Sequence, residues 1–357
     1  MPSLPSVDVT LFVHNGAATV AEAIDSVLAQ TWPNLTLTLI DDGSTDATPD
    51  ILAAYAARDG RIRRKTNRRN GGAIGGFQRA FWFGDADFVM PKSADDLIAP
   101  DFIARAMDVL LAHPGTAMCH ARGLVFRDGA AERPAYPAEH ALHAVGEDPI
   151  ARARQVMQHY TSSPSFWGVY RRTAVDQLSP IRFRAGWDHV VLAELALYGE
   201  IRHVPEPLYF RRDGGKPVLQ LARASTEQGM RGVPLDDVLG ELRWRTPLVT
   251  TAYAHLEAFA ATRLDAAARA TLMRLAGAVF RARWLPALRQ EAAALRAQLP
   301  ALTARLATLD PTLAHWLARG LADAVRGVET ILPDEDFTAA QLEIAALAGD
   351  AQRRAAA

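Results

Sequence analysis

The chain has 357 residues, of which 49% are hydrophobic, so it has enough apolar material for two folded domains and is not a disordered protein. A formal net charge of −1 leaves no excess of basic groups that would attract nucleic acid, and we expect no nucleic-acid partner. A single cysteine excludes an internal disulfide framework and fits a reducing compartment.

No part of the sequence predicts a segment that crosses a membrane. Residues 1–15 lack the basic and apolar regions of a secretory signal peptide, and no stretch reaches the roughly 20 apolar residues that span a bilayer. We therefore expect a cytoplasmic protein. A peripheral contact with the inner face of the membrane stays open.

Short apolar runs and helical segments alternate through the first half of the chain. Strands are predicted at 7–13 (VDVTLFV) and 35–40 (LTLTLI), and helices follow them at 19–30 and 47–57. Short polar turns join these elements. Such an alternation is typical of a mostly parallel sheet with helices on its faces.

The alternation continues to about residue 215. Further strands are predicted at 61–65, 85–92, 117–126 and 165–172. Further helices are predicted to end at 83 and to cover 99–113, 151–160 and 190–198. We therefore predict one α/β domain over residues 1–215.

The composition changes after residue 215. Residues 216–234 are rich in glycine and polar groups and are predicted to form a flexible linker or a lid, whereas 235–357 shows only helical patterns. Seven leucines follow the spacing of a helix-packing seam: Leu288, Leu295, Leu299, Leu302, Leu306, Leu309 and Leu313. Prolines at 286, 300 and 311 are predicted to break this stretch, which argues against a long coiled coil. A small helical bundle and a homodimer through these helices both fit the pattern.

Acidic residues occur in three of the predicted loops. Asp41 and Asp42 end the second strand, Asp95 and Asp96 follow the strand at 85–92, and Asp188 is predicted in the loop before the helix at 190–198. Ligands of open parallel sheets bind beyond the carboxyl ends of the strands. Converging carboxylates there favour Mn²⁺ or Mg²⁺ bound together with a substrate diphosphate. The alternatives are an ordinary turn at Asp42 and helix caps at Asp96 and Asp188.

Four motifs in this order carry a resemblance to a known family. The motifs VDVTLFVHN, LIDDGSTD, SADDLIAPDF and GWDHVVLAELALYG resemble those of glycosyltransferase family 2, whose members have the GT-A fold. The resemblance covers about residues 5–212. It implies a GT-A-like (Rossmann-like) domain that moves a sugar from a nucleotide diphosphate sugar, most commonly UDP-linked, to an acceptor hydroxyl with inversion.

The resemblance also implies roles for individual residues. Val13, His14, Asn15 and Asp42 would bind the nucleotide base, and Gly72 lies in the glycine-containing turn that the family has near the diphosphate. This glycine run is not a phosphate-binding P-loop, because the GK[ST] ending is absent. It also lies too late in the chain for a dinucleotide-binding fingerprint, which excludes a dehydrogenase.

The metal and catalytic positions are carried over in the same way. Asp95 and Asp96 match the acidic metal-binding motif, with Asp96 as the direct ligand, and Asp188 matches the base that takes the proton from the acceptor. Trp187 is predicted to stack on a sugar ring or to be a core tryptophan. Arg211 and Arg212 are predicted to contact the diphosphate or to be solvated charges.

Three positions depart from the family pattern. Ser93 stands where a further aspartate is common, Asp213 where a histidine is frequent, and His14 where a tyrosine is common. Ser93 and Asp213 change the set of side chains expected to bind the metal, and His14 changes the ring expected to stack against the base.

The function expected from the sequence is a metal-assisted inverting glycosyltransferase of the hexosyltransferase type, in glycan or polysaccharide biosynthesis. Its acceptor is left open between a glycan, a lipid carrier and a protein. One alternative is a nucleotidyltransferase that acts on a sugar phosphate and releases pyrophosphate. The other is a nucleotide-binding or scaffold protein whose catalytic site has decayed.

Overall fold

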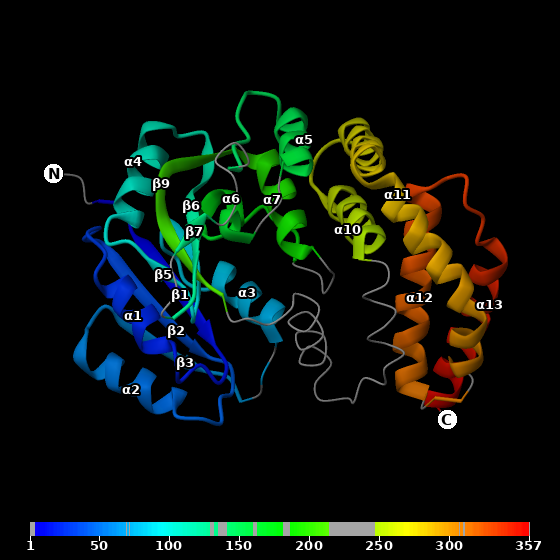
Figure 1. Cartoon of the computed structure of the whole chain (residues 1–357), viewed down its shortest axis with the longest axis horizontal. Helices are drawn as coiled ribbons and strands as arrows, with labels where there is room; N and C mark the ends of the chain where they lie inside the picture. The colour runs from blue at the N-terminus through cyan, green and yellow to red at the C-terminus, as the bar shows by residue number, and fades with distance from the viewer. Residues whose placement is uncertain are drawn as a thin grey trace. The chain divides into compact units, whose positions relative to one another are not determined.

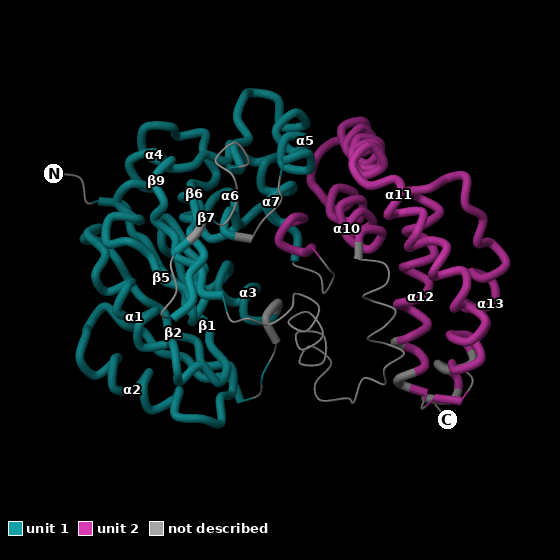
Figure 2. Tube along the Cα trace, viewed as in Figure 1, with its two compact units in different colours: residues 1–181, 191–232 teal, residues 182–190, 233–357 magenta. Residues whose placement is uncertain are grey.

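The structure, a computed structural model, describes residues 4–68, 70, 72–128, 132–134, 141–159, 163–180, 186–213, 247–306, 308–309 and 311–356. The chain forms two compact units (Figure 2). The first comprises residues 1–181 and 191–232, and the second comprises 182–190 and 233–357. The linker or lid predicted at 216–234 lies outside the described residues.

The first unit begins with a regular alternation of strands and helices (Figure 1). In chain order the elements are β1 (Val7–Val13), α1 (Val20–Leu28), β2 (Leu35–Asp41), α2 (Thr48–Arg58), β3 (Ile62–Thr66), α3 (Gly72–Trp82) and β4 (Phe88–Ser93). Each predicted element in this part is present, with its ends shifted by a few residues.

The second part of this unit contains shorter and mixed elements. They are β5 (Leu97–Ile98), α4 (Phe102–Ala112), β6 (Thr116–Phe126), β7 (Arg133–Pro134), α5 (Pro149–His159), the 3₁₀ turn η2 (Ser163–Phe166), β8 (Gly168–Arg171), α6 (Arg172–Val175), α7 (Trp187–Tyr198) and β9 (Glu200–Arg212). The described strands form one nine-stranded sheet in the order β3-β2-β1-β4-β8-β6-β9-β5, with β7 paired to β6. β1 to β4 pair in parallel, as do β6 and β9, which confirms the predicted α/β class.

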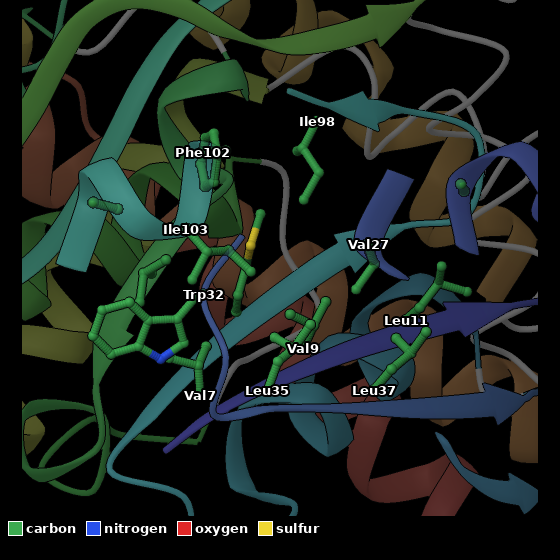
Figure 3. Packing of buried hydrophobic residues seen from close by; sticks show 14 of the residues in the cluster. Val7, Val9, Leu11, Val27, Trp32, Leu35, Leu37, Ile98, Phe102 and Ile103 are labelled. Atoms are coloured by element: carbon green, nitrogen blue, oxygen red, sulfur yellow. The ribbon is translucent and has the colours of Figure 1, made fainter. Parts of the chain in front are cut away.

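Residues of β1 alternate between the two faces of the sheet. Val7, Val9 and Leu11 belong to the large buried cluster that α1 and α4 cover (Figure 3). Phe12 faces the opposite side, where its ring lies 4.6 Å from that of Phe77 of α3. Because successive side chains of a strand point to opposite faces, helices cover this strand on both sides. The nearly continuous apolar run VDVTLFV is typical of such a doubly covered strand.

The strand at one end of the sheet is basic. β3 pairs only with β2 among the described strands, and its Arg63, Arg64 and Lys65 are exposed. The Lys65 ammonium lies 3.4 Å from the centre of the Phe83 ring, a cation–π distance. At the other end of the strand order, β5 has two residues.

The start of α7 differs from the prediction. The sequence places Asp188 in a loop before a helix at 190–198, but the helix begins at Trp187 and Asp188 lies in its first turn. The amide of Val190 donates to the carbonyl of Gly186, which has φ of +67°. A carboxylate in a first helical turn interacts favourably with the helix dipole, which stabilises this earlier start.

The described elements of the second unit after residue 233 are helices. They are α10 (Pro247–Ala261), α11 (Ala266–Leu306), α12 (Pro311–Ile331) and α13 (Thr338–Ala356). The predicted break at Pro300 is wrong, because α11 runs through that position, whereas α12 begins at Pro311 as predicted. The predicted break at Pro286 is confirmed as a kink: two helical segments of α11 meet at Trp284, which has non-helical angles two residues before Pro286.

Five of the predicted seam leucines are buried within the helical unit: Leu288, Leu295, Leu299, Leu302 and Leu306. They therefore contribute to the core of a helical bundle. None of the described helices is both long enough and apolar enough to cross a membrane.

Glu291 makes the stability of the helical unit depend on pH. Its two carboxylate oxygens accept the amides of Leu248 and Val249 in the first turn of α10, at 3.1 and 2.9 Å. Burial nevertheless raises the pKa of Glu291 to about 7. Because the pKa of Glu291 is higher in the folded than in the unfolded chain, the protonated side chain favours folding. This contribution to the free energy of unfolding is present at low pH and is lost as the pH rises through 7.

We therefore expect the free energy of unfolding to fall less between pH 5 and 8 in Glu291→Gln than in the parent protein. The difference should be on the order of 1–2 kcal/mol, allowing for partial exposure of the carboxyl. Asp8 and Asp96, whose pKa values burial also raises to about 6, titrate in both proteins and cancel from the comparison. Parallel stability curves from urea unfolding at several pH values would contradict this assignment.

Candidate functional site

Three loops meet at the carboxyl edge of the parallel strands. In the sheet, Val13 at the end of β1 is the partner of Asp41 at the end of β2, and Phe12 is the partner of Ser93 at the end of β4. The strand order reverses direction at β1, between β2 and β4. Such a switch point is the usual ligand site of an open α/β sheet. The fold therefore brings together the loops of His14, Asp42 and Asp95.

The first two loops hold each other through backbone contacts. The Nδ1 atom of His14 lies 3.1 Å from the carbonyl oxygen of Asp42, and the amide of Asp42 donates to the carbonyl of Val13. Asn15 has φ of 51°, a left-handed conformation that asparagine tolerates. Its side-chain oxygen accepts the amide of Thr45, and its own amide donates to the hydroxyl of Ser44. These hydrogen bonds join the β1 loop to the β2 loop.

Asp42 is buried and its carboxylate is oriented by two donors. Its Oδ1 atom accepts from Nδ2 of Asn67 at 2.8 Å and from Nη1 of Arg79 in α3 at 3.2 Å. Gly72 is the first residue of α3, the helix that brings Arg79 to this carboxylate. An oriented carboxylate beside the β1 loop can accept hydrogen bonds from the N–H groups of a nucleobase or from ribose hydroxyls. Asn67 and Arg79 were not predicted.

Asp96 faces the interior of the protein. It is 4% exposed, its Oδ1 accepts the amide of Arg212 at 2.8 Å, and its Oδ2 accepts the hydroxyl of Tyr209. Burial raises the pKa of Asp96 to about 6. The carboxylate therefore ties the acidic turn to the end of β9.

Asp95 is exposed and differs from Asp96 in its surroundings. Its Oδ1 accepts the hydroxyl of Ser93, which stands where the family often has an aspartate. Lys92, fully buried, donates its ammonium group to the carbonyl oxygens of Ser93 and Asp96 and so fixes the backbone of the turn. Burial lowers the pKa of Lys92 to about 8.

This donor set fits a divalent cation that is shared with a substrate. Among the described residues no three acidic, histidine or cysteine side chains converge on one point. Mg²⁺ and Mn²⁺ at diphosphate sites commonly use one or two carboxylates and complete their coordination with phosphate oxygens and water. The exposed carboxylate of Asp95 meets this need, whereas both oxygens of Asp96 already accept protein donors.

Arg212 is engaged by the protein itself. Its guanidinium pairs with Glu22 of α1 and with Asp128, and its Nε donates to the carbonyl oxygen of Asp95 at 3.0 Å. The side chain is 10% exposed. Arg211, the other arginine predicted to contact the diphosphate, is partly exposed at the same strand end.

Two further features of this edge bear on the predicted site. Asp213, where a histidine is frequent in the family, pairs with Arg127 at 3.1 Å. Trp167 is partly exposed, and its ring stacks on that of Tyr209 with centroids 6.1 Å apart and 7° between the planes. The partly exposed Trp167 offers an apolar surface beside the residue that holds Asp96. In the sequence, Trp167 lay within the strand predicted at 165–172 and was not predicted as a site residue.

Trp187 and Asp188 are placed differently from the other predicted residues. Both lie in the part of α7 that groups with the helical unit, whereas the β1, β2 and β4 loops belong to the first unit. Both side chains are partly exposed. An accessible carboxylate is a side chain that can serve as a general base.

Comparison with known sequences identifies relatives of the first unit. The model of the family "Glycosyl transferase family 2" matches residues 8–178. The uncharacterized glycosyltransferase alr2836 of Nostoc sp. (strain PCC 7120) is 25% identical over 226 residues, which are 62% of this chain and 69% of the relative. The match to the family model includes the β1 loop, Asp42 and the acidic turn, and it ends before Asp188.

Solved structures extend the comparison to both units. TarS 1–349 of S. aureus, in complex with UDP-GlcNAc, matches with a TM-score of 0.56 at 14% identity, over 91% of this chain and 90% of that one. The mannosyltransferase PcManGT from Pyrobaculum calidifontis, in complex with GDP-Man and Mn²⁺, matches with a TM-score of 0.51 at 17% identity, over 94% and 89%. At these identities the matches show the fold, and they confirm the GT-A-like architecture with a helical carboxyl-terminal region.

Proposed function

Because its residues 8–178 belong to glycosyl transferase family 2, we propose that this chain transfers a hexose from a nucleotide diphosphate sugar to an acceptor hydroxyl, with inversion at the anomeric carbon. The observation that carries this proposal is the meeting of three loops at the switch point of the sheet. There an oriented carboxylate, Asp42, and an exposed one, Asp95, share one edge. The first suits a nucleoside and the second a diphosphate-bound cation.

The donor is proposed to be a UDP-sugar. The β1 loop with Val13, His14 and Asn15, together with Asp42, would hold the base and ribose. The solved relatives with bound donors include one with UDP-GlcNAc and one with GDP-Man, so both nucleotides occur among proteins of this fold. We favour UDP because the resemblance of the LIDDGSTD motif points to uracil.

The chemistry is divided between two carboxylates. Asp188 accepts the proton of the acceptor hydroxyl as that oxygen forms its bond to the anomeric carbon and the bond to the diphosphate oxygen breaks. Asp95 would hold Mn²⁺ or Mg²⁺, whose charge stabilises the departing diphosphate. Arg211 would add a second positive group near the diphosphate. Asp96, Tyr209 and Lys92 keep the acidic turn in shape.

The acceptor is proposed only by class. A single displacement needs a hydroxyl, which a glycan, a lipid carrier or a protein side chain can supply. We propose a role in polysaccharide biosynthesis in the cytoplasm, with the inner face of the membrane as the place where a lipid-linked acceptor would be met. A homodimer through the helical unit would use surfaces other than its buried leucine seam.

Thermal unfolding with UDP, GDP, CMP and dTDP, each with and without Mn²⁺, tests the donor site. A ligand at 100 times its dissociation constant adds about 2.7 kcal/mol to the free energy of unfolding, a readily measured rise in melting temperature. We expect the largest rise with UDP plus Mn²⁺. We also expect Asp42→Asn to reduce it, because a neutral amide loses the ion pair with Arg79 that orients this side chain.

The products distinguish the remaining possibilities. Release of a nucleoside diphosphate from the selected donor supports the transferase, whereas release of pyrophosphate from a nucleoside triphosphate and a sugar phosphate would show a nucleotidyltransferase. A protein that binds none of the four nucleotides would have a decayed site, and the proposal would then be wrong.

A further inference from the structure

The first turn of α7 is held by the helical unit. Residues 186–190 group with that unit, whereas α7 from Val191 onward groups with the sheet. Gly186 lies against Thr251 of α10, and a Cβ atom at this glycine would lie 2.6 Å from the Thr251 Oγ1 and Cγ2 atoms. Its φ of +67° also favours glycine. Helix α10 therefore approaches the backbone next to α7 more closely than any larger residue at 186 would allow.

A buried pair of histidines makes the second contact. The Nδ1 atom of His189 lies 2.7 Å from Nε2 of His255, and Nδ1 of His255 lies 2.8 Å from the carbonyl oxygen of Thr251. A carbonyl only accepts, so His255 carries its proton on Nδ1. Its Nε2 then accepts, and Nδ1 of His189 must donate. The hydrogen bonds run in one direction, from His189 through His255 to the backbone of α10.

The surroundings keep this pair neutral and rigid. His189 and His255 are 7% and 0% exposed, and the Phe280 ring of α11 lies 5.0 Å from the His255 ring and 6.1 Å from the His189 ring. Burial lowers the pKa of His255 to about 4 and the pKa of His189 well below its usual range. A packed, neutral pair with one allowed set of tautomers holds a single geometry.

We propose that His255 is a positioning residue for sugar transfer: through its hydrogen bond to His189, the helical unit fixes the first turn of α7 and with it the carboxylate of Asp188. Asp188 directly precedes His189, so any rotation of that turn moves the base. This inference rests on the proposed role of Asp188. It gives residues of the helical unit a part in the chemical step.

The test compares His255→Phe with His255→Gln in the full chain. Phenylalanine keeps the aromatic volume but removes both hydrogen bonds. Glutamine keeps an amide oxygen for His189 and an NH₂ group for the Thr251 carbonyl. The activity measured is hydrolysis of the UDP-sugar that the parent protein turns over with Mn²⁺, followed as UDP release, so that water replaces the unidentified acceptor.

We expect His255→Phe to lower kcat by about 100-fold, the effect of a misplacement of about 1 Å, with KM for the donor and the binding of UDP changed less than about twofold. His255→Gln should recover much of kcat. Imidazole ¹⁵N shifts should report the Nδ1–H tautomer of His189 in the parent protein. This tautomer should persist in His255→Gln.

The matched control is Phe259→Leu, which removes volume from the same buried helix, 6.0 Å from the His255 ring, without touching the hydrogen bonds. An equal loss of kcat in Phe259→Leu would overturn the inference, because general loosening of α10 would explain both. Full kcat in a folded His255→Phe protein, with Asp188→Asn inactive, would overturn the positioning role alone. If Asp188→Asn is itself fully active, the proposed function of Asp188 is wrong and the inference falls with it.

Discussion

Asp188→Asn should lower the rate of sugar transfer by about 10²- to 10⁴-fold, the range that general bases contribute. Asparagine has nearly the shape of aspartate and is neutral at all pH values of interest, so it cannot take the proton from the acceptor. The first turn of α7 should persist, because the Val190 amide and the His189 ring keep their partners. The measurement is steady-state release of UDP, with UDP affinity determined separately.

Asp176→Asn is the matched control for this variant. It makes the same chemical change at an exposed position directly after α6 and should leave both kcat and UDP affinity unchanged. Loss of UDP binding in Asp188→Asn would show that Asp188 belongs to the donor site and is not the base. Unchanged turnover would exclude it from the reaction altogether.

Asp95→Asn and Asp96→Asn should separate the two neighbouring carboxylates. If the exposed Asp95 is the metal ligand, Asp95→Asn loses about 10²-fold or more of metal-supported activity, the range for removal of one electrostatic contact at a reacting group. Added Mn²⁺ should then no longer increase the rise in melting temperature that UDP causes. The activity of Asp96→Asn should still depend on Mn²⁺, because the asparagine side chain can keep both contacts of Asp96. Its oxygen can accept the backbone amide of Arg212, and its NH₂ group can donate to the hydroxyl oxygen of Tyr209.

The reverse pattern would contradict this assignment. If Asp96→Asn loses its response to Mn²⁺ while Asp95→Asn keeps it, Asp96 is the direct ligand, as the family resemblance implies. The two variants differ by one position in the same turn and both remove one negative charge. Asp95 is exposed and Asp96 is buried, so the variant that alone loses its response to Mn²⁺ while remaining folded identifies the ligand.

Much of the first unit follows from local sequence. The strands β1 and β2 are continuous apolar runs bounded by polar turns, and such runs are recognised without knowledge of their partners. The thirteen-residue β9 is only partly apparent, because Pro205 and Pro207 lack the amide donors of a regular strand. It forms nevertheless, since its pairing with β6 shifts register at Arg122, opposite Pro207. This irregular pairing depends on a strand about 85 residues earlier in the chain, so no local sequence pattern predicts it.

The candidate site shows the same limit. The acidic residues at the strand ends were predicted, because strand order and turn chemistry are local. The opposite orientations of Asp95 and Asp96 were not predicted, since they depend on the pairing of β5 with β9. That pairing brings Tyr209 to a carboxylate 113 positions earlier. The early start of α7 was missed for a similar reason: its first turn is stabilised by Thr251 and His255 of another helix.

The two ends of the strand order protect the sheet against association with other chains. An edge strand presents unpaired amide and carbonyl groups, on which a foreign strand can add and start aggregation. β5 is too short to serve as a template, and β3 carries exposed Arg63, Arg64 and Lys65 along its length. A second copy of β3 would have to bring these like charges together. Both ends of the sheet therefore disfavour the addition of another chain as a further strand.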